Sequence, residues 1–206
     1  MPNIVVFHTC LEIATWAAVL RSIWVLGGMV QMLFKRLPEG TLEWDWSVLV
    51  NVPEPFLLPV AAYLLRRGLV FPEIVAAPSL VLAIVGAVLS LCGLAISFWA
   101  FYSYPNVGTG HYVDSDHQIV TKGAYGFVRH PIYLGVFLIW FGLAISYGSP
   151  IALALAALYV VPAYVVYIRS EERMLAARVG PEYLAYKHRV PGLFPRIFRA
   201  PERDGA

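Results

Sequence analysis

The chain has 206 residues, of which 59% are hydrophobic and 14% are charged, and its mean hydropathy is +0.68. Soluble domains carry roughly 25% charged residues, so this composition excludes an ordinary soluble domain and predicts an integral membrane protein. The net charge of +2 is small and the charges are scattered, which excludes a nucleic-acid partner. Cys10 and Cys92 lie in apolar runs without disulfide or zinc spacing, so we expect no metal site.

Five apolar runs are long enough to cross a bilayer, which takes about 20 residues. They lie at residues 4–34, 47–65, 77–101, 131–148 and 150–168. The sequence therefore predicts an all-α, multi-pass fold of five transmembrane helices. We expect a single membrane domain over residues 1–206, with three N-terminal spans in 1–101 and the catalytic part in 102–196.

Charged residues interrupt the first two runs. Glu12, Arg21 and Glu54 are costly in lipid and are therefore functional candidates, although we assign none of them to catalysis. Glu12 and Arg21 lie on opposite faces of one helix, so they should not pair with each other. Glu54 either contacts Arg21 from the next helix or lies at the membrane interface between its two flanking prolines.

The third run carries small residues at helical spacing, a pattern that favours close helix packing. These residues are Gly86, Ser90, Gly93 and Ser97. The last two runs are separated by little more than Gly148-Ser149-Pro150, which predicts an antiparallel hairpin. The helical pattern of the fifth run continues to residue 179. At 1.5 Å per residue such a helix is about 45 Å long, so its end should emerge from a hydrocarbon core of about 30 Å.

The distribution of lysine and arginine predicts the orientation. With five spans, Lys35 and Arg36, Lys122 and Arg129, and the basic C-terminal tail fall on one side, which should be cytoplasmic. Arg66 and Arg67 are exceptions to this rule. The loop 102–130 and the tail then face the cytoplasm together with the last helical hairpin, and we expect these three parts to form a pocket.

The dipeptide His130-Pro131 marks the start of the fourth span. Proline is favoured at the first helical position, so His130 should be the N-cap of a helix beginning at Pro131. The free amides and the dipole of a helix N-terminus attract anions, and Arg129 beside them would strengthen that attraction. The alternative is that Arg129 reaches lipid phosphates while His130 only caps the helix.

The segments 116-DHQIVTKGAYGFVRHPIYLG-135 and 171-EERMLAARVGPEYLAYKHRVPGLFP-195 add a wider pattern. It consists of a hydrophobic pair, G-x-Y, R-H-P-x-Y, a glutamate pair, G-x-E-Y-x-x-Y and a closing V-P. Together these motifs resemble the isoprenylcysteine carboxyl methyltransferase family, whose members are membrane methyltransferases related to the phospholipid N-methyltransferases. The resemblance covers roughly residues 104–196.

The resemblance implies S-adenosylmethionine as the methyl donor. By analogy with the family, the cofactor site is formed by His117, Gln118, Ile119, Val120, Tyr125, His130, Pro131, Ile132 and Tyr133. This agrees with the physical interpretation, because the carboxylate of the cofactor suits a helix N-terminus. Its sulfonium can lie against the face of Tyr125 or Tyr133, and its adenine suits the apolar Ile119 and Val120.

The family glutamate of the fifth helix matches Glu171, and with Glu172 it should shape the acceptor side of the pocket. Characterised eukaryotic members have an arginine one helical turn earlier, where this chain has Tyr167. Arg169 is offset from that position by two residues, about 200° around the helix. We take Glu171, Arg169 and Arg129 as catalytic candidates, and Tyr167, Glu171 and Glu172 as substrate-binding candidates.

The function predicted is methyl transfer to a lipophilic small molecule or lipidated substrate, preferably the carboxylate of a prenylcysteine-like acceptor. A phospholipid N-methyltransferase of the phosphatidylethanolamine type is the alternative, and that reaction needs a base such as Glu171 or Glu172. Sterol reductases share an R-H-P-x-Y-L-G element, although this chain is short for their architecture. A non-catalytic membrane protein is a further alternative. We expect membrane lipids to surround the protein.

Overall fold

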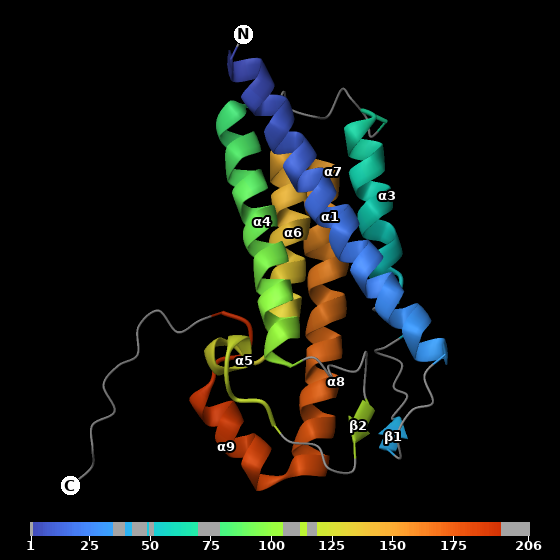
Figure 1. Cartoon of the computed structure of the whole chain (residues 1–206), viewed down its shortest axis with the longest axis vertical. Helices are drawn as coiled ribbons and strands as arrows, with labels where there is room; N and C mark the ends of the chain where they lie inside the picture. The colour runs from blue at the N-terminus through green and yellow to red at the C-terminus, as the bar shows by residue number, and fades with distance from the viewer. Residues whose placement is uncertain are drawn as a thin grey trace, which may run out of the picture.

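A computed structural model describes residues 2–34, 40–42, 49, 52–69, 79–104, 112–114 and 119–194 of the chain. Long helices lie side by side in an up-and-down bundle (Figure 1). They are α1 (Pro2–Phe34), α3 (Glu54–Arg66), α4 (Leu80–Ser103), α6 (Pro131–Ser146) and the continuous helix formed by α7 (Pro150–Leu155), the π-helical turn η1 (Ala156–Val160) and α8 (Val161–Val179). Two short helices, α5 (Ala124–Phe127) and α9 (Pro181–Arg189), lie at one end of the bundle.

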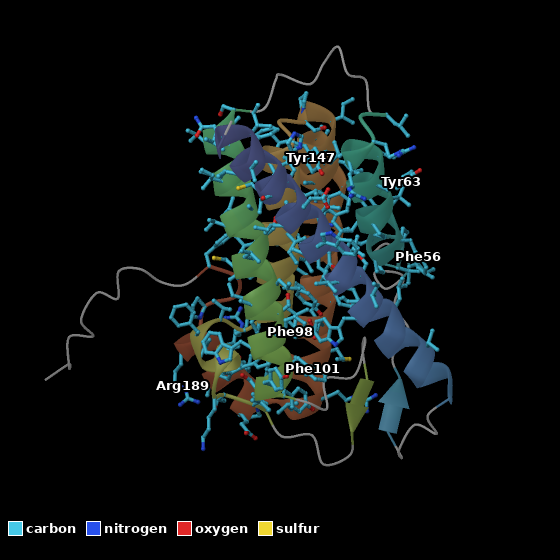
Figure 2. All side chains as sticks on the ribbon, turned by 45° about the horizontal axis from the view of Figure 1, so that its top comes forward. Phe56, Tyr63, Phe98, Phe101, Tyr147 and Arg189 are labelled. Atoms are coloured by element: carbon cyan, nitrogen blue, oxygen red, sulfur yellow. The ribbon has the colours of Figure 1, made fainter. Side chains whose placement is uncertain are left out.

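Each predicted span corresponds to one of these helices. Three segments of the described chain are long and apolar enough to cross a membrane: Asn3–Gly28, Leu80–Ser103 and Pro150–Val179. Helix α6 is apolar but has 16 residues, and α3 has 13. Figure 2 shows Phe56 and Tyr63 on the outer side of α3, where they are 50% and 57% exposed. Large apolar side chains on the outer faces of a bundle are typical of contact with lipid.

Helix α3 covers the later part of the second predicted span. Residues 47, 48, 50 and 51 of the expected run lie outside the described residues, and α3 itself begins at Glu54. Pro53 is its N-cap and Pro55 lies in its first turn. Proline lacks a backbone N–H, and it is tolerated in the first turn because an N–H there would have no acceptor within the helix. The two prolines therefore favour a helix start at this point.

The predicted all-α class holds for the bundle, but a short two-stranded ribbon accompanies it. Strand β1 (Gly40–Leu42) pairs antiparallel with β2 (Tyr112–Asp114), so that Thr41 lies opposite Val113. Strand β2 interrupts the loop 102–130, which we predicted without strands. Runs of three residues are too short to show a two-residue periodicity in the sequence.

Small residues allow α4 and α6 to approach closely, as their spacing predicts. A Cβ atom added at Gly93 would lie 2.5 Å from the carbonyl oxygen of Gly135, and one at Gly142 would lie 2.6 Å from that of Gly86. Ser97 remains buried in this interface by donating a hydrogen bond to the carbonyl of Gly93 at 2.9 Å. Backbones at such distances have no room for side chains, which confirms the close packing of α4.

The predicted hairpin and the predicted long last helix are both present. Helix α6 ends at Ser146 and α7 begins at Pro150, after the left-handed Gly148 (φ 58°). The last helix then runs from Pro150 to Val179. Its π-helical turn precedes Pro162, whose ring and missing N–H disturb the preceding turn of a regular α-helix.

The helices α4 and α8 end, and α6 begins, at one end of the bundle, which we call the site end (Figure 1). Helix α5 is fastened there because the Ser103 hydroxyl accepts a hydrogen bond from the Ala124 amide at 3.1 Å. Gly180 turns the chain from α8 into α9 with a left-handed φ of 70°. The site end therefore gathers the R-H-P-x-Y motif, the glutamate pair and the G-x-E-Y-x-x-Y motif.

Candidate active site at the start of α6

His130 is the N-cap of α6 and Pro131 is its first residue, as the sequence predicts. The His130 side chain makes no capping hydrogen bond. The backbone amides of Arg129 and His130 donate to the carbonyls of Pro191 and Gly192, at 2.8 and 3.0 Å. The C-terminal segment thus runs beside the helix start, and the imidazole is available for other contacts.

Glu172 on α8 is surrounded by cations. Its Oε1 accepts hydrogen bonds from Arg129 Nε at 3.0 Å and Nη2 at 2.6 Å, and lies 3.0 Å from His130 Nε2. Its Oε2 lies 2.7 Å from Lys187 Nζ of α9. Arg129 Nη1 also donates to the carbonyls of Lys187 and Val190. Glu172 therefore joins the start of α6 to the ends of α8 and α9.

Glu171 has a different environment from its neighbour. Its Oε2 accepts a hydrogen bond from the Tyr133 hydroxyl at 3.0 Å and lies 3.5 Å from His130 Nδ1. The Tyr133 ring stacks on His130, with centroids 5.5 Å apart and an interplanar angle of 13°. His130 thus contacts both glutamates and Tyr133 at once.

Tyrosines continue the site into the bundle. Tyr133 contacts Tyr164 at 5.2 Å and Tyr167 at 5.8 Å between ring centroids, and Phe137 lies against Tyr164. These rings come from α6 and α8, and Tyr133 links them to the Glu171 carboxylate. Aromatic faces with a nearby carboxylate form an environment that favours cations.

Tyr183 and Tyr186 of α9 form a small apolar cluster with Val190, against which Ile119 packs. The Tyr186 hydroxyl donates to the carbonyl of Tyr125 at 2.7 Å, and burial raises the pKa of Tyr186 to about 12. The Tyr183 hydroxyl is buried and has no hydrogen-bond partner among the described residues. Burial raises the pKa of Tyr183, with Glu172 and Arg129 among its charged neighbours.

The pKa of His130 is shifted by its surroundings in the site. Burial lowers its pKa, but hydrogen bonds to Glu171 and Glu172 raise it more, so the net pKa lies above the ordinary value of 6.5. The two glutamates therefore favour the charged imidazolium.

The structure gathers most of the predicted site residues at the site end. Arg129, His130, Tyr133, Glu171 and Glu172 contact one another as described, and Tyr167 contacts Tyr133. Pro131 is buried in the first turn of α6, where Ile132 is half-buried. Tyr125 lies in α5, edge-on to Tyr104 at 6.4 Å, and its pKa is raised by burial.

The other predicted residues are placed differently. Ile119 and Val120 are half-buried, whereas His117 and Gln118 lie outside the described residues. Arg169 is exposed on α8 and takes no part in the contacts described above.

Sequence reasoning missed Tyr164, Tyr183, Tyr186 and Lys187 as site residues. The G-x-E-Y-x-x-Y motif held a signal for two of them, because positions i and i+3 share one face of a helix. Lys187, one position after Tyr186, faces Glu172 across the Gly180 turn. The hydrogen bond between Tyr164 and Glu54 spans 110 positions of the chain and leaves no local pattern.

A comparison with known protein families matches the part of the chain that contains Arg129, His130, Tyr133 and the glutamate pair. Residues 81–181, about half of the chain, match the family described as phospholipid methyltransferase. The protein-S-isoprenylcysteine O-methyltransferase of Schizosaccharomyces pombe is 33% identical over 84 residues, which are 41% of this chain and 36% of that protein. Protein-S-isoprenylcysteine O-methyltransferase B of Arabidopsis thaliana is 36% identical over 85 residues, which are 41% of this chain and 43% of that protein.

A relative with a different name is the cobalt-zinc-cadmium resistance protein CzcN of Cupriavidus metallidurans, 37% identical over 82 residues, which are 40% of this chain and 38% of that protein. In each of these comparisons the chain spans less than half of the relative's length. The apolar helices, the matched family and the methyltransferases among the relatives support the class of the membrane methyltransferases. Within that class, the named isoprenylcysteine methyltransferases among the relatives support the family resemblance that the motifs predicted.

Proposed function

We propose that the chain is a membrane methyltransferase that uses S-adenosylmethionine and acts on a lipophilic acceptor. The observation that carries this proposal is the contact between the R-H-P-x-Y motif and the glutamate pair. Arg129 and His130 bind Glu172, and Tyr133 binds Glu171, across 38 to 43 positions of the chain. The segment that matches phospholipid methyltransferases contains all five residues.

The residues present fit S-adenosylmethionine. That molecule carries a carboxylate, an ammonium and a sulfonium, and the site offers both signs of charge beside aromatic faces. The buried Tyr183 hydroxyl, which has no partner among the described residues, is a polar atom that a ligand would satisfy. His130, Tyr133 and Tyr125 would hold the group together with Ile119 and Val120, and so would the predicted His117 and Gln118.

When bound, the cofactor supplies a methyl group on a sulfonium. The residues of the chain then have to align the acceptor with this group and exclude water. Pro131 and Ile132 hold the helix start, and α9 would shield the site from solvent. Glu171 and Arg129 remain catalytic candidates, as does Arg169, which would have to turn inward from its exposed position.

The first acceptor we propose is a prenylcysteine-like carboxylate, because several relatives are named for that substrate. A carboxylate has a pKa near 4 and is already ionised at neutral pH. Methyl transfer to such a carboxylate needs no base. The tyrosines and Glu172 would then only shape the acceptor side of the pocket.

An amine acceptor is the second candidate, and the surroundings of Glu171 favour it. Arg129 is committed to Glu172 and to two carbonyls. Tyr167 stands where the related enzymes carry an arginine. Glu171 is therefore bordered by tyrosines and His130, which suits an ammonium head group and a general base.

The pH dependence of methyl transfer separates these two acceptors. Transfer to a prenylcysteine analogue should proceed at a nearly constant rate from about pH 6 to 9. Transfer to phosphatidylethanolamine should become faster through the same range, because an amine must lose a proton first. Turnover of the amine alone, with a rising profile, would replace the first candidate with the second. Turnover of neither lipid class would contradict the proposed function.

We also propose that all five long helices cross the membrane as parts of a single domain. The N-terminus would lie outside, and the site end would face the cytoplasm. The polar cofactor then arrives from the cytoplasm, while a lipophilic acceptor enters sideways between helices. The gathering of the ends of α4 and α8 and the start of α6 at one end supports this arrangement.

A further inference from the structure

A second polar cluster lies inside the bundle, away from the glutamate pair. The Glu54 carboxylate on α3 accepts hydrogen bonds from Arg21 Nη1 of α1 at 2.7 Å, Trp140 Nε1 of α6 at 2.8 Å and the Tyr164 hydroxyl of α8 at 3.0 Å. Arg21 Nη2 also donates to the Tyr164 hydroxyl at 3.2 Å. All four residues are at most 3% exposed. Four helices are therefore joined through one carboxylate.

The energetics of this cluster do not explain its presence by stability alone. Removing two charges from water costs several kcal/mol per ion, and replacing a buried pair by well-packed apolar residues is often neutral or stabilising. Ionisable residues inside a membrane bundle are rare and commonly functional. The second ion pair between α1 and α3, Glu12 with Arg66, differs in being 42% and 52% exposed.

Tyr164 connects the cluster to the candidate site. Its ring lies 5.2 Å from that of Tyr133, centroid to centroid, and its hydroxyl is held by Glu54 and Arg21. Tyr133 in turn donates to Glu171 and stacks on His130. The orientation of Tyr164 therefore limits where Tyr133 can lie.

We propose that Glu54 and Arg21 are positioning residues for the cofactor and acceptor site, and that they act through the Tyr164 hydroxyl. Both residues precede the segment that matches the methyltransferase family, which begins at residue 81. The N-terminal helices thus take part in shaping the site in addition to embedding it. This inference rests on the proposed function, since it concerns the same site.

Tyr164→Phe tests the inference without breaking the ion pair. The substitution keeps the ring, the Arg21–Glu54 contact and the Trp140 hydrogen bond, and removes only the hydroxyl. Truncating Glu54 would instead leave Arg21 buried and unpaired, and the protein would be prone to unfold. The matched control is Tyr147→Phe. It removes a second interhelical tyrosine hydrogen bond, 2.7 Å long to Thr15 of α1, at the other end of α6.

Calorimetry with S-adenosylhomocysteine measures both affinity and the fraction of competent protein. We expect Tyr164→Phe to raise Kd about threefold to fivefold at unchanged stoichiometry, which corresponds to one net hydrogen bond. Tyr147→Phe should bind like the unsubstituted protein. A reduced stoichiometry with unchanged Kd would show a structural role only and overturn the inference.

An unchanged Kd in folded Tyr164→Phe, or an equal increase in both variants, would also overturn the inference while leaving the proposed function intact. Failure of the unsubstituted protein to bind S-adenosylhomocysteine would be a different result, because it would overturn the proposed function and this inference with it.

Discussion

Arg129 and Glu172 form the most extensively bonded ion pair at the site end, with one carboxylate oxygen accepting from both Nε and Nη2 of the guanidinium, at 3.0 and 2.6 Å. Their side chains are 11% and 12% exposed. The residue before the α6 cap is thereby tied to the last turns of α8. This contact brings the two halves of the family pattern together in space.

Glu172→Gln should destabilise the protein strongly, because it leaves Arg129 and Lys187 without their counter-ion. Breaking a buried pair from one side typically costs about 3–5 kcal/mol. We expect a clear drop in the thermal midpoint in detergent. The control is Glu12→Gln, which removes the exposed pair with Arg66 and should cost at most about 1 kcal/mol. Equal shifts in the two variants would contradict this account of Glu172.

Stability should depend on pH through His130. Its pKa is raised in the folded protein, so its contribution to stability is fully present below about pH 6.5 and is lost as the pH rises through the folded value. The groups that face it are Glu171, Glu172 and Arg129, together with Tyr133. The thermal midpoint of the unsubstituted protein should therefore fall from pH 6 to 8 by more than that of His130→Gln. Parallel curves would show that His130 does not gain a proton on folding.

Gly93→Ala should separate α4 from α6, since its added Cβ would meet the Gly135 carbonyl at 2.5 Å. Backbone atoms cannot move aside as a side chain can, so we expect a lower thermal midpoint. Gly27→Ala is the matched control, because nothing lies within 4 Å of its added Cβ. That control should be neutral or stabilising by up to about 1 kcal/mol. A neutral Gly93→Ala would contradict the close packing.

The proposed topology predicts opposite labelling at the two ends of the bundle. In a protein without Cys10 and Cys92, a membrane-impermeant thiol reagent should reach Pro150→Cys from outside. It should reach Lys122→Cys only from the cytoplasmic side. Both positions are exposed. Labelling of Pro150→Cys from the cytoplasm would reverse the orientation.

Local signals in the sequence predicted much of the fold. The apolar runs, the proline after His130 and the short Gly148-Ser149 turn each depend on neighbouring residues, and the structure agrees with all of them. The start of α3 at Glu54 depends on the prolines beside it, which a hydropathy average does not register.

Long-range pairings in the site were less predictable. The R-H-P-x-Y motif and the glutamate pair were expected to form one pocket, but their mutual contacts span about forty positions. From the sequence, Glu54 could either contact Arg21 or lie at the membrane interface. The packing of four helices in the structure brings it into contact with Arg21. Tyr164 was missed because an aromatic residue in an apolar helix resembles ordinary core.

Binding of S-adenosylhomocysteine to His130→Ala tests the central claim most directly. We expect the affinity of His130→Ala for S-adenosylhomocysteine to fall about tenfold or more, because the variant removes charge-assisted hydrogen bonds worth about 1.5–3 kcal/mol. His8→Ala, which removes an exposed histidine of α1, should bind like the unsubstituted protein. Circular dichroism and gel filtration would establish that both variants are folded. We predict a weakened titration for His130→Ala alone, whereas unchanged affinity in the folded variant would contradict the assignment of this residue to the cofactor site.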